Sequence, residues 1–263
     1  MLELYHHGSS ACAAKVRLAL AEKQLEWTGH YVDILAGEQF SEAFLAINPK
    51  AVVPVLIHDG NVIPESTIIC EYIEDAFPSH PIYSADALER AAIRSWTRAV
   101  DEELHPACSA LTYIVSHRHT IMRNGIGSFE DFLAGSIEGR AARERKWAWI
   151  QQGVEAPGAA DFFRLYVGFL KKMNAALQQA QWLAGDALTM ADIAMAPYLF
   201  RLECLALEGW WTGGRLPEVE RWYSAISQRP AFDSALRGWL PEELGKEMRA
   251  NGERSRSAIE AVL

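Results

Sequence analysis

The spacing of apolar residues changes once along this chain, and that change sets the fold class. Residues 1–80 alternate short apolar runs with segments of helical spacing, in the order β-α-β-α-β-β-α. From Asp86 onwards, apolar residues recur with the 3.6-residue period of amphipathic helices. Two prolines interrupt both patterns within residues 78–86, which are the predicted linker. We therefore expect an α/β domain over residues 1–80 and an all-helical domain over residues 86–263.

Four strands and three helices are expected in the α/β domain. Asp59-Gly60 lies between two apolar runs and has the chemistry of a tight hairpin turn. The expected strands are Leu2–Tyr5, Trp27–Val32, Val53–Ile57 and Asn61–Ile63, and the expected helices are Ala11–Lys23, Phe40–Ile47 and Ser66–Phe77.

Two later signals indicate helices in the second domain. A long helix should begin at Asp86 and continue past Pro106 with a kink, because proline lacks the N–H that a helix requires. Thr189 is a typical helix N-cap, and Asp192, three residues later, can bond back to the cap amide. We therefore interpret Asp192 as a capping residue rather than as a catalytic acid.

Charge and cysteine content exclude several classes of protein. The 263 residues carry a formal net charge of −9 with basic residues scattered singly, so no patch for nucleic acid or an anionic membrane is predicted. We expect neither a signal peptide nor a transmembrane helix. The four cysteines, Cys12, Cys70, Cys108 and Cys204, match no disulfide framework and no metal motif. A cytoplasmic protein without a metal is expected.

The junction between the first strand and the first helix is a candidate site. Ser10 and Cys12 lie where unpaired backbone N–H groups and the helix dipole stabilise an anion such as a thiolate. Ser10 could donate a hydrogen bond to that anion, or it could simply cap the helix. This segment alone does not separate the two interpretations.

Two further loops of the same domain carry ligand-binding chemistry. Val53-Pro54 begins a strand, and a cis X-Pro turn there would expose the main-chain N–H and C=O of Val53 to a peptide ligand. Glu65 and Ser66 place a carboxylate and a hydroxyl at a helix N-terminus, where they suit an α-amino and an α-carboxylate group. The three loops together predict one ligand site.

In combination, these motifs resemble the cytosolic glutathione transferases over nearly the whole chain. The resemblance implies a thioredoxin-like N-terminal domain, a helical-bundle C-terminal domain, glutathione as co-substrate, a role in detoxification and a homodimer. Its motifs are Ser-x-Cys-x-x-x-Val-Arg at Ser10 to Arg17, Asn48-Pro49 ahead of Val53-Pro54, Glu65-Ser66 followed by Ile-Ile-Cys-Glu-Tyr-Ile, and the Thr189–Asp192 capping box.

By position, the resemblance implies a complete glutathione site. Two departures are Val52, where the family often has glutamine, and Cys12, which lies inside the helix rather than at its start. The implied residues are Ser10 for the thiolate, Val53 and the cis-proline Pro54 for the cysteinyl part, Glu65 and Ser66 for the γ-glutamyl group, and Gln39 and Lys50 for the glycine carboxylate.

Within the family, residues 65–78 and 94–102 look like the bacterial glutathione-dependent β-aryl etherases, which cleave lignin-derived ethers. The segment 119–158 is also similar to them. This resemblance implies that a glutathione thiolate attacks an electrophilic carbon of a hydrophobic aromatic substrate and displaces an aryloxide. The candidate residues for the substrate wall are Tyr113, His117, Trp147 and Trp149.

Other functions compete with this one. Cys12 could act as the nucleophile of thiol–disulfide exchange or deglutathionylation, and the fold could serve a non-catalytic binding protein. A general transferase with another electrophile competes with the etherase. The homodimer is expected to use the helix from Ser66 and the long helix from Asp86, with Trp96 allowing close approach.

Overall fold

The sheet of the first domain has four strands in the order β2-β1-β3-β4 in the computed structural model, which describes residues 1–123 and 140–263. The β1 strand runs parallel to β2 and antiparallel to β3, and β3 and β4 form a hairpin. Asp59 and Gly60 both have positive φ, as the predicted turn requires. The strands are β1 (Leu2–His6), β2 (Thr28–Tyr31), β3 (Val55–His58) and β4 (Asn61–Pro64).

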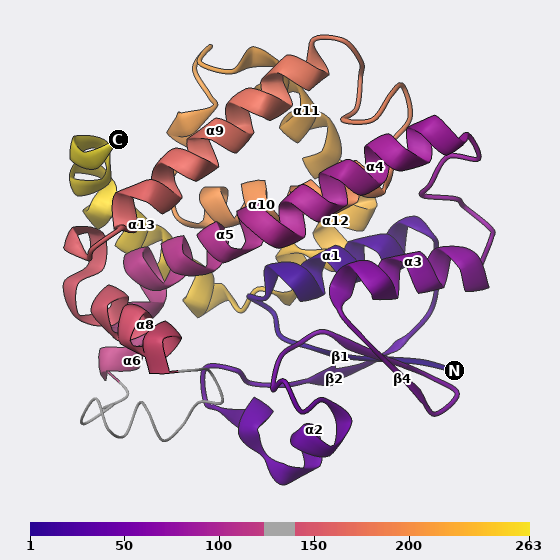
Figure 1. Ribbon diagram of the computed structural model, residues 1–263, viewed down its shortest axis with the longest axis horizontal. Coiled ribbons are helices and arrows are strands. Elements are labelled where there is room, and N and C mark those ends of the chain that lie inside the picture. Colours follow the sequence, from indigo (N-terminus) through magenta and orange to yellow (C-terminus); the bar gives the residue numbers. More distant parts are fainter. Residues whose placement is uncertain (124–139) are drawn as a thin grey trace.

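Three α-helices accompany this sheet. Figure 1 shows α1 (Ala11–Glu22) and α3 (Ser66–Ala76) between the sheet and the second domain, with α2 (Glu42–Ile47) on the opposite side. The predicted helix over Phe40–Ile47 begins later, because the Ser41 hydroxyl accepts a hydrogen bond from the Phe44 amide and caps α2. A short 3₁₀-helix, Glu38–Phe40, precedes it.

One long helical segment opens the second domain, as predicted, but it is not a single α-helix. Two π-helical segments, Val100–Leu104 and Tyr113–His117, interrupt it. The first ends two residues before Pro106, where wider turns accommodate the missing N–H. The helices of this domain are α4 (Ala87–Ala99), α5 (His105–Thr112), α6 (Arg118–Arg123), α8 (Arg140–Gln152), α9 (Ala159–Leu177), α10 (Met190–Cys204), α11 (Pro217–Ser227), α12 (Pro230–Ala235) and α13 (Glu242–Val262).

Helix α1 is the element that both domains share. It packs against α3 on one side and against α10 and α12 on the other (Figure 1), so residues on every face of it are buried. Ion pairs fix the two domains together: Lys15 contacts Asp101 at 2.8 Å, and Arg229 contacts Glu22 at 2.6 Å. The start of α1 is therefore held rigidly at the domain boundary.

The predicted linker is a fixed connection. The Glu74 carboxylate accepts hydrogen bonds from the Ile82 and Tyr83 amides, and Lys23 pairs with Glu74 at 2.6 Å. Trp96 is buried within the second domain and donates to the Leu183 carbonyl at 3.0 Å. Trp96 therefore packs within the second domain, and its expected role in close approach of a second subunit stays a prediction. Within the described residues, no helix is both long and apolar enough to cross a bilayer.

The capping box at the start of α10 is confirmed. The Asp192 carboxylate accepts from the Thr189 amide at 3.0 Å, and it also accepts from the Leu183 amide at 2.9 Å and the Trp222 indole at 2.8 Å. Asp192 thus caps α10 and ties it to the preceding loop and to α11. Burial raises the pKa of this carboxyl to about 6.

We predict that Asp192→Ala lowers the free energy of unfolding by about 3 kcal/mol or more, because three buried donors lose their acceptor at about 1–3 kcal/mol each. Urea denaturation followed by tryptophan fluorescence measures this change. Asp186→Ala removes an exposed carboxylate from the same loop and should change the stability by less than about 0.5 kcal/mol. Equal losses in the two variants would contradict the prediction.

Candidate functional site

The Ser10 hydroxyl lies at the start of α1 and faces a cavity. Its oxygen accepts a hydrogen bond from the Ala13 amide at 3.2 Å, so Ser10 is the N-cap of α1. Ser10 also lines a cavity of about 340 Å³ at the domain boundary. Because the cap uses only the hydroxyl oxygen as an acceptor, the hydroxyl proton stays available to an anion in this cavity. The two interpretations of Ser10 are therefore compatible.

Two adjoining cavities meet at the start of α1. The first, of about 340 Å³, extends under the second domain, and the second, of about 410 Å³, extends along the start of α3. Their arrangement offers room for two ligand groups on either side of one helix N-terminus. The residues that line both cavities are Cys12, Val52, Val53 and His105.

The second cavity brings together the peptide-binding groups expected from the sequence. The Val53-Pro54 bond is cis, as predicted, and no main-chain hydrogen bond of Val53 to another described residue is found. Glu65 and Ser66 line the same cavity, and Glu65 has a φ of +71°, a conformation that non-glycine residues seldom adopt. Asp101, on the π-helical segment of the second domain, adds a carboxylate that sequence reasoning missed.

Lys50 and Glu65 are closer together than their expected roles imply. The resemblance assigns them to opposite ends of glutathione, yet Lys50 Nζ lies 2.7 Å from Glu65 Oε1. Both side chains are exposed, and such pairs contribute only about 0–1 kcal/mol, so a ligand can separate them at small cost. Gln39 lines the first cavity, and its amide donates to the Ile34 carbonyl at 3.3 Å.

Cys12 forms a pair with His105, which the sequence analysis did not identify. Cys12 is the second residue of α1, so it lies in the first turn. Its Sγ is 3.4 Å from His105 Nδ1 and 3.9 Å from the Tyr198 hydroxyl, which is itself 3.2 Å from His105 Nδ1. The one sequence signal for His105 is its place next to Pro106, where a distorted helix is often functional.

The Cys12–His105 contact favours a thiolate. Burial would raise the pKa of the Cys12 thiol, but the charge and hydrogen bond of His105, with a smaller effect of Lys15, lower it to about 7. Burial would likewise lower the pKa of His105, yet the Cys12 sulfur raises it on balance. The structure therefore supports a thiolate–imidazolium pair at the junction of the two cavities.

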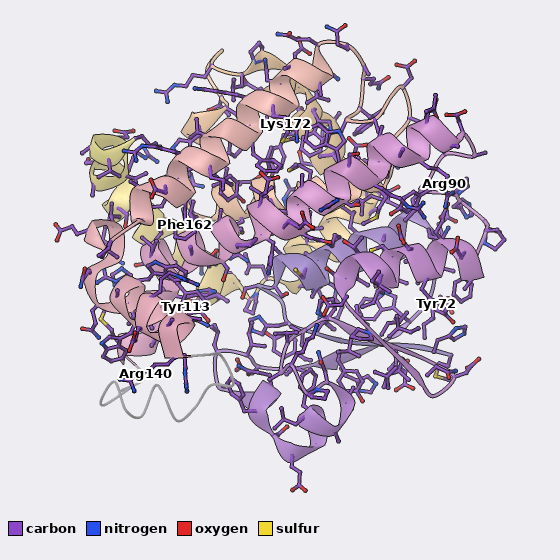
Figure 2. All side chains as sticks on the ribbon, viewed as in Figure 1. Tyr72, Arg90, Tyr113, Arg140, Phe162 and Lys172 are labelled. Atoms are coloured by element: carbon purple, nitrogen blue, oxygen red, sulfur yellow. The ribbon has the colours of Figure 1, made fainter. Side chains whose placement is uncertain are left out.

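The lining of the first cavity contains two of the four residues expected in the substrate wall. Tyr113 (labelled in Figure 2) and His117 both line it, and both belong to the second π-helical segment. Trp147 and Trp149 are not among the described residues that line this cavity, and Trp149 packs edge-on against Phe162. Of the 119–158 segment, residues 124–139 lie outside the described part of the chain.

Comparison with known proteins connects this site to one family. Residues 9–76 match the glutathione S-transferase N-terminal domain and residues 167–230 match the C-terminal domain. The chain is 30% identical to "Protein LigF" of Sphingobium sp. strain SYK-6, over 93% of this chain and 96% of that protein. It is 26% identical to a zeta-class glutathione S-transferase of Euphorbia esula, over 92% of each chain.

Comparison with a solved structure supports the same family fold. The crystal structure of the β-etherase LigF from Sphingobium sp. strain SYK-6 superposes with a TM-score of 0.79 at 28% identity. The match covers 89% of this chain and 98% of that one. The similarity therefore includes both domains and the boundary between them.

We predict that Cys12 reacts with iodoacetamide at a rate that rises through about pH 7 rather than near the ordinary thiol pKa of about 8.5, because the thiolate is the reacting form. Mass spectrometry of the alkylated peptides measures the midpoint. His105→Gln should move the midpoint upward. Cys70 is a control within the same chain, because burial raises its pKa to about 12 and it should stay unmodified. An unchanged midpoint in His105→Gln would rule out the pair.

Proposed function

We propose that this chain, which belongs to the glutathione S-transferase family, joins the thiol of glutathione to an electrophilic carbon of a hydrophobic aromatic substrate. The observation that carries the proposal is the pair of adjoining cavities with the start of α1 between them. One cavity presents groups that suit the main chain and amino group of a peptide. The other offers space for a second reactant beneath the second domain.

Glutathione is the co-substrate, and we propose that it spans the second cavity. Glu65, Ser66 and Asp101 suit its γ-glutamyl group, because its ammonium needs carboxylates and its carboxylate needs N–H and O–H donors. The free main-chain groups of Val53 suit the cysteinyl residue. Lys50, released from Glu65, would then contact the glycine carboxylate near Gln39.

Ser10 and the start of α1 are proposed to hold the glutathione thiolate. A free thiol has a pKa of about 8.5, so lowering that pKa increases the nucleophile at neutral pH. The thiolate attacks the electrophilic carbon, a C–S bond forms, and the leaving group departs with the bonding electron pair. Glutathione and free cysteines both suit a reducing compartment, so we place the enzyme in the cytoplasm.

For the electrophile we propose a β-aryl ether next to a ketone. The similarity to LigF over both domains supports this choice. The carbonyl makes the neighbouring carbon electrophilic, and the aryloxide leaves as a stabilised anion. The protein then supplies a thiolate, orientation and a cavity from which water is excluded. Tyr113 and His117, which line this cavity, are proposed to contact the substrate rings.

A second candidate function is favoured by the Cys12–His105 contact. In thiol–disulfide exchange, the Cys12 thiolate attacks the glutathionyl sulfur of a mixed disulfide, and the other thiol leaves as a thiolate that takes a proton. A second glutathione then attacks the Cys12 mixed disulfide, releasing oxidised glutathione and restoring Cys12. This route uses the same glutathione site with a protein thiol as the nucleophile.

Ser10→Ala should raise the pKa of enzyme-bound glutathione by about one unit or more, because a hydrogen bond to a charged group contributes about 1.5–3 kcal/mol and one unit equals 1.36 kcal/mol. Conjugation of a generic aryl halide should fall about tenfold or more. The ultraviolet absorbance of the bound thiolate against pH measures the first change. Cys12→Ser should instead retain conjugation and lose exchange. If Ser10→Ala changes neither value, backbone amides or Cys12 hold the thiolate.

We expect a fluorogenic β-aryl ether ketone to release its phenol when it is incubated with the enzyme and glutathione. Released fluorescence and the glutathione thioether, seen by mass spectrometry, are the two products to measure. An aryl halide assayed in parallel controls for the general transferase. Conjugation of the halide without any released phenol would refute the etherase assignment and leave the transferase in place.

We also propose a homodimer that uses α3 and α4. Two apolar side chains on these helices are exposed, with Ile68 at 53% and Leu88 at 82% of their surface. A partner subunit would remove them from water. Light scattering at micromolar concentration should give twice the mass of the chain, and Leu88→Glu should shift the protein toward monomer. A monomeric parent chain would contradict the proposal.

A further inference from the structure

The Arg201 side chain, on α10, is a buried cation with too few partners. Arg201 is 7% exposed and lines the 340 Å³ cavity. Its guanidinium carries five N–H donors. It donates to the Ser9 carbonyl and, at 3.3 Å, to the weakly accepting Met248 sulfur, whereas its Nε has no partner. No carboxylate pairs with Arg201 in the described part of the chain. Burying a charge without a counter-ion is costly.

Arg17 shows how this fold satisfies a buried guanidinium that has only a structural role. It donates to the Ala235 carbonyl at 2.7 Å and to the His7 carbonyl at 3.2 Å, and it also contacts His6 and the Gly8 carbonyl. Arg17 is not among the described residues that line either cavity. Arg201 differs in both respects, which indicates that its missing partner comes from the cavity.

The residues around Arg201 also suit an acidic ligand. His117 is 5% exposed, lines the same cavity, and its Nδ1 has no hydrogen-bond partner. Lys146 lines the cavity too, with Nζ 4.5 Å from the centroid of the Tyr113 ring. Although the chain has a net charge of −9, the described lining of this cavity includes no aspartate or glutamate.

We propose that Arg201 and His117 form a carboxylate-binding subsite, so that the electrophile of this enzyme is an aromatic organic acid. Assigning the acid to the electrophile rests on the proposed transferase function. The carboxylate would accept from the Arg201 guanidinium, and the neutral His117 imidazole would supply a further N–H. A β-aryl ether substrate would accordingly carry its carboxylate on one of its rings.

The glutathione thiolate is the competing anion, because Arg201 contacts the Ser9 carbonyl next to Ser10. The two roles have different consequences. If Arg201 stabilised the thiolate, its loss would raise the pKa of bound glutathione and lower the rate of conjugation for all electrophiles alike. If it binds the carboxylate of the electrophile, its loss would lower the affinity for acidic ligands and leave the affinity for neutral ligands of the same shape unchanged.

Calorimetry on the full chain with S-methylglutathione bound separates these roles. The probes are 2-naphthoate and 2-naphthamide, which have the same shape and differ by one negative charge. We expect the parent chain to bind naphthoate at least tenfold more tightly than naphthamide. Arg201→Met should abolish this difference, and Arg201→Lys should restore part of it. Arg215→Met, which removes an exposed cation from the same domain, should leave it unchanged.

Several outcomes decide the proposal. Equal affinities for the two probes in the parent chain would overturn it. It would also be overturned if Arg201→Met lowered the affinity for both probes equally and raised the pKa of bound glutathione. If Arg201→Met does not fold, His117→Phe keeps the ring contact with Tyr113 and should reduce the preference for naphthoate severalfold. Failure of S-methylglutathione to bind would count instead against the transferase function, because the naphthoate and naphthamide titrations can be repeated on the chain alone.

Discussion

The burial of α1 on every side is the constraint on which the rest of the structure depends. A helix between a sheet and a helical layer has no solvated face, so its charged side chains need partners inside the protein. Lys15 forms an ion pair with Asp101, Lys23 at the end of the helix forms an ion pair with Glu74, and Arg17 donates hydrogen bonds to main-chain carbonyls. Because Asp101 belongs to the second domain and Ala235, whose carbonyl binds Arg17, belongs to α12, these contacts join the domains. The helix N-terminus is thereby fixed where the two cavities meet.

The two π-helical segments shape the side of the site that the second domain contributes. The segment Val100–Leu104 contains Asp101 and leads directly into His105, and the segment Tyr113–His117 contributes Tyr113 and His117 to the cavity wall. A π-turn widens the helix and changes the direction in which its side chains point. This one long helical segment supplies groups to both cavities.

Charge is separated across the site. Carboxylates, Glu65 and Asp101, line the cavity along α3, whereas cations, Arg201 and Lys146, line the cavity under the second domain. Cys12 and His105 lie between the two ends and line both cavities. This separation supports the proposed occupants, an amino group on one side and an acid on the other.

The sequence by itself determined the change from α/β to helical pattern, the Asp59-Gly60 turn and the Thr189–Asp192 capping box, because local hydrogen bonds and backbone sterics specify each of them. It also brought out Ser10, Val53 and Glu65 as loop residues of one site. Tertiary structure alone decided that Cys12 meets His105, 93 residues away, and that Arg201 lines the cavity without a carboxylate. Such contacts depend on how two domains pack and where a helix widens, and the local spacing of residues in the sequence predicts neither.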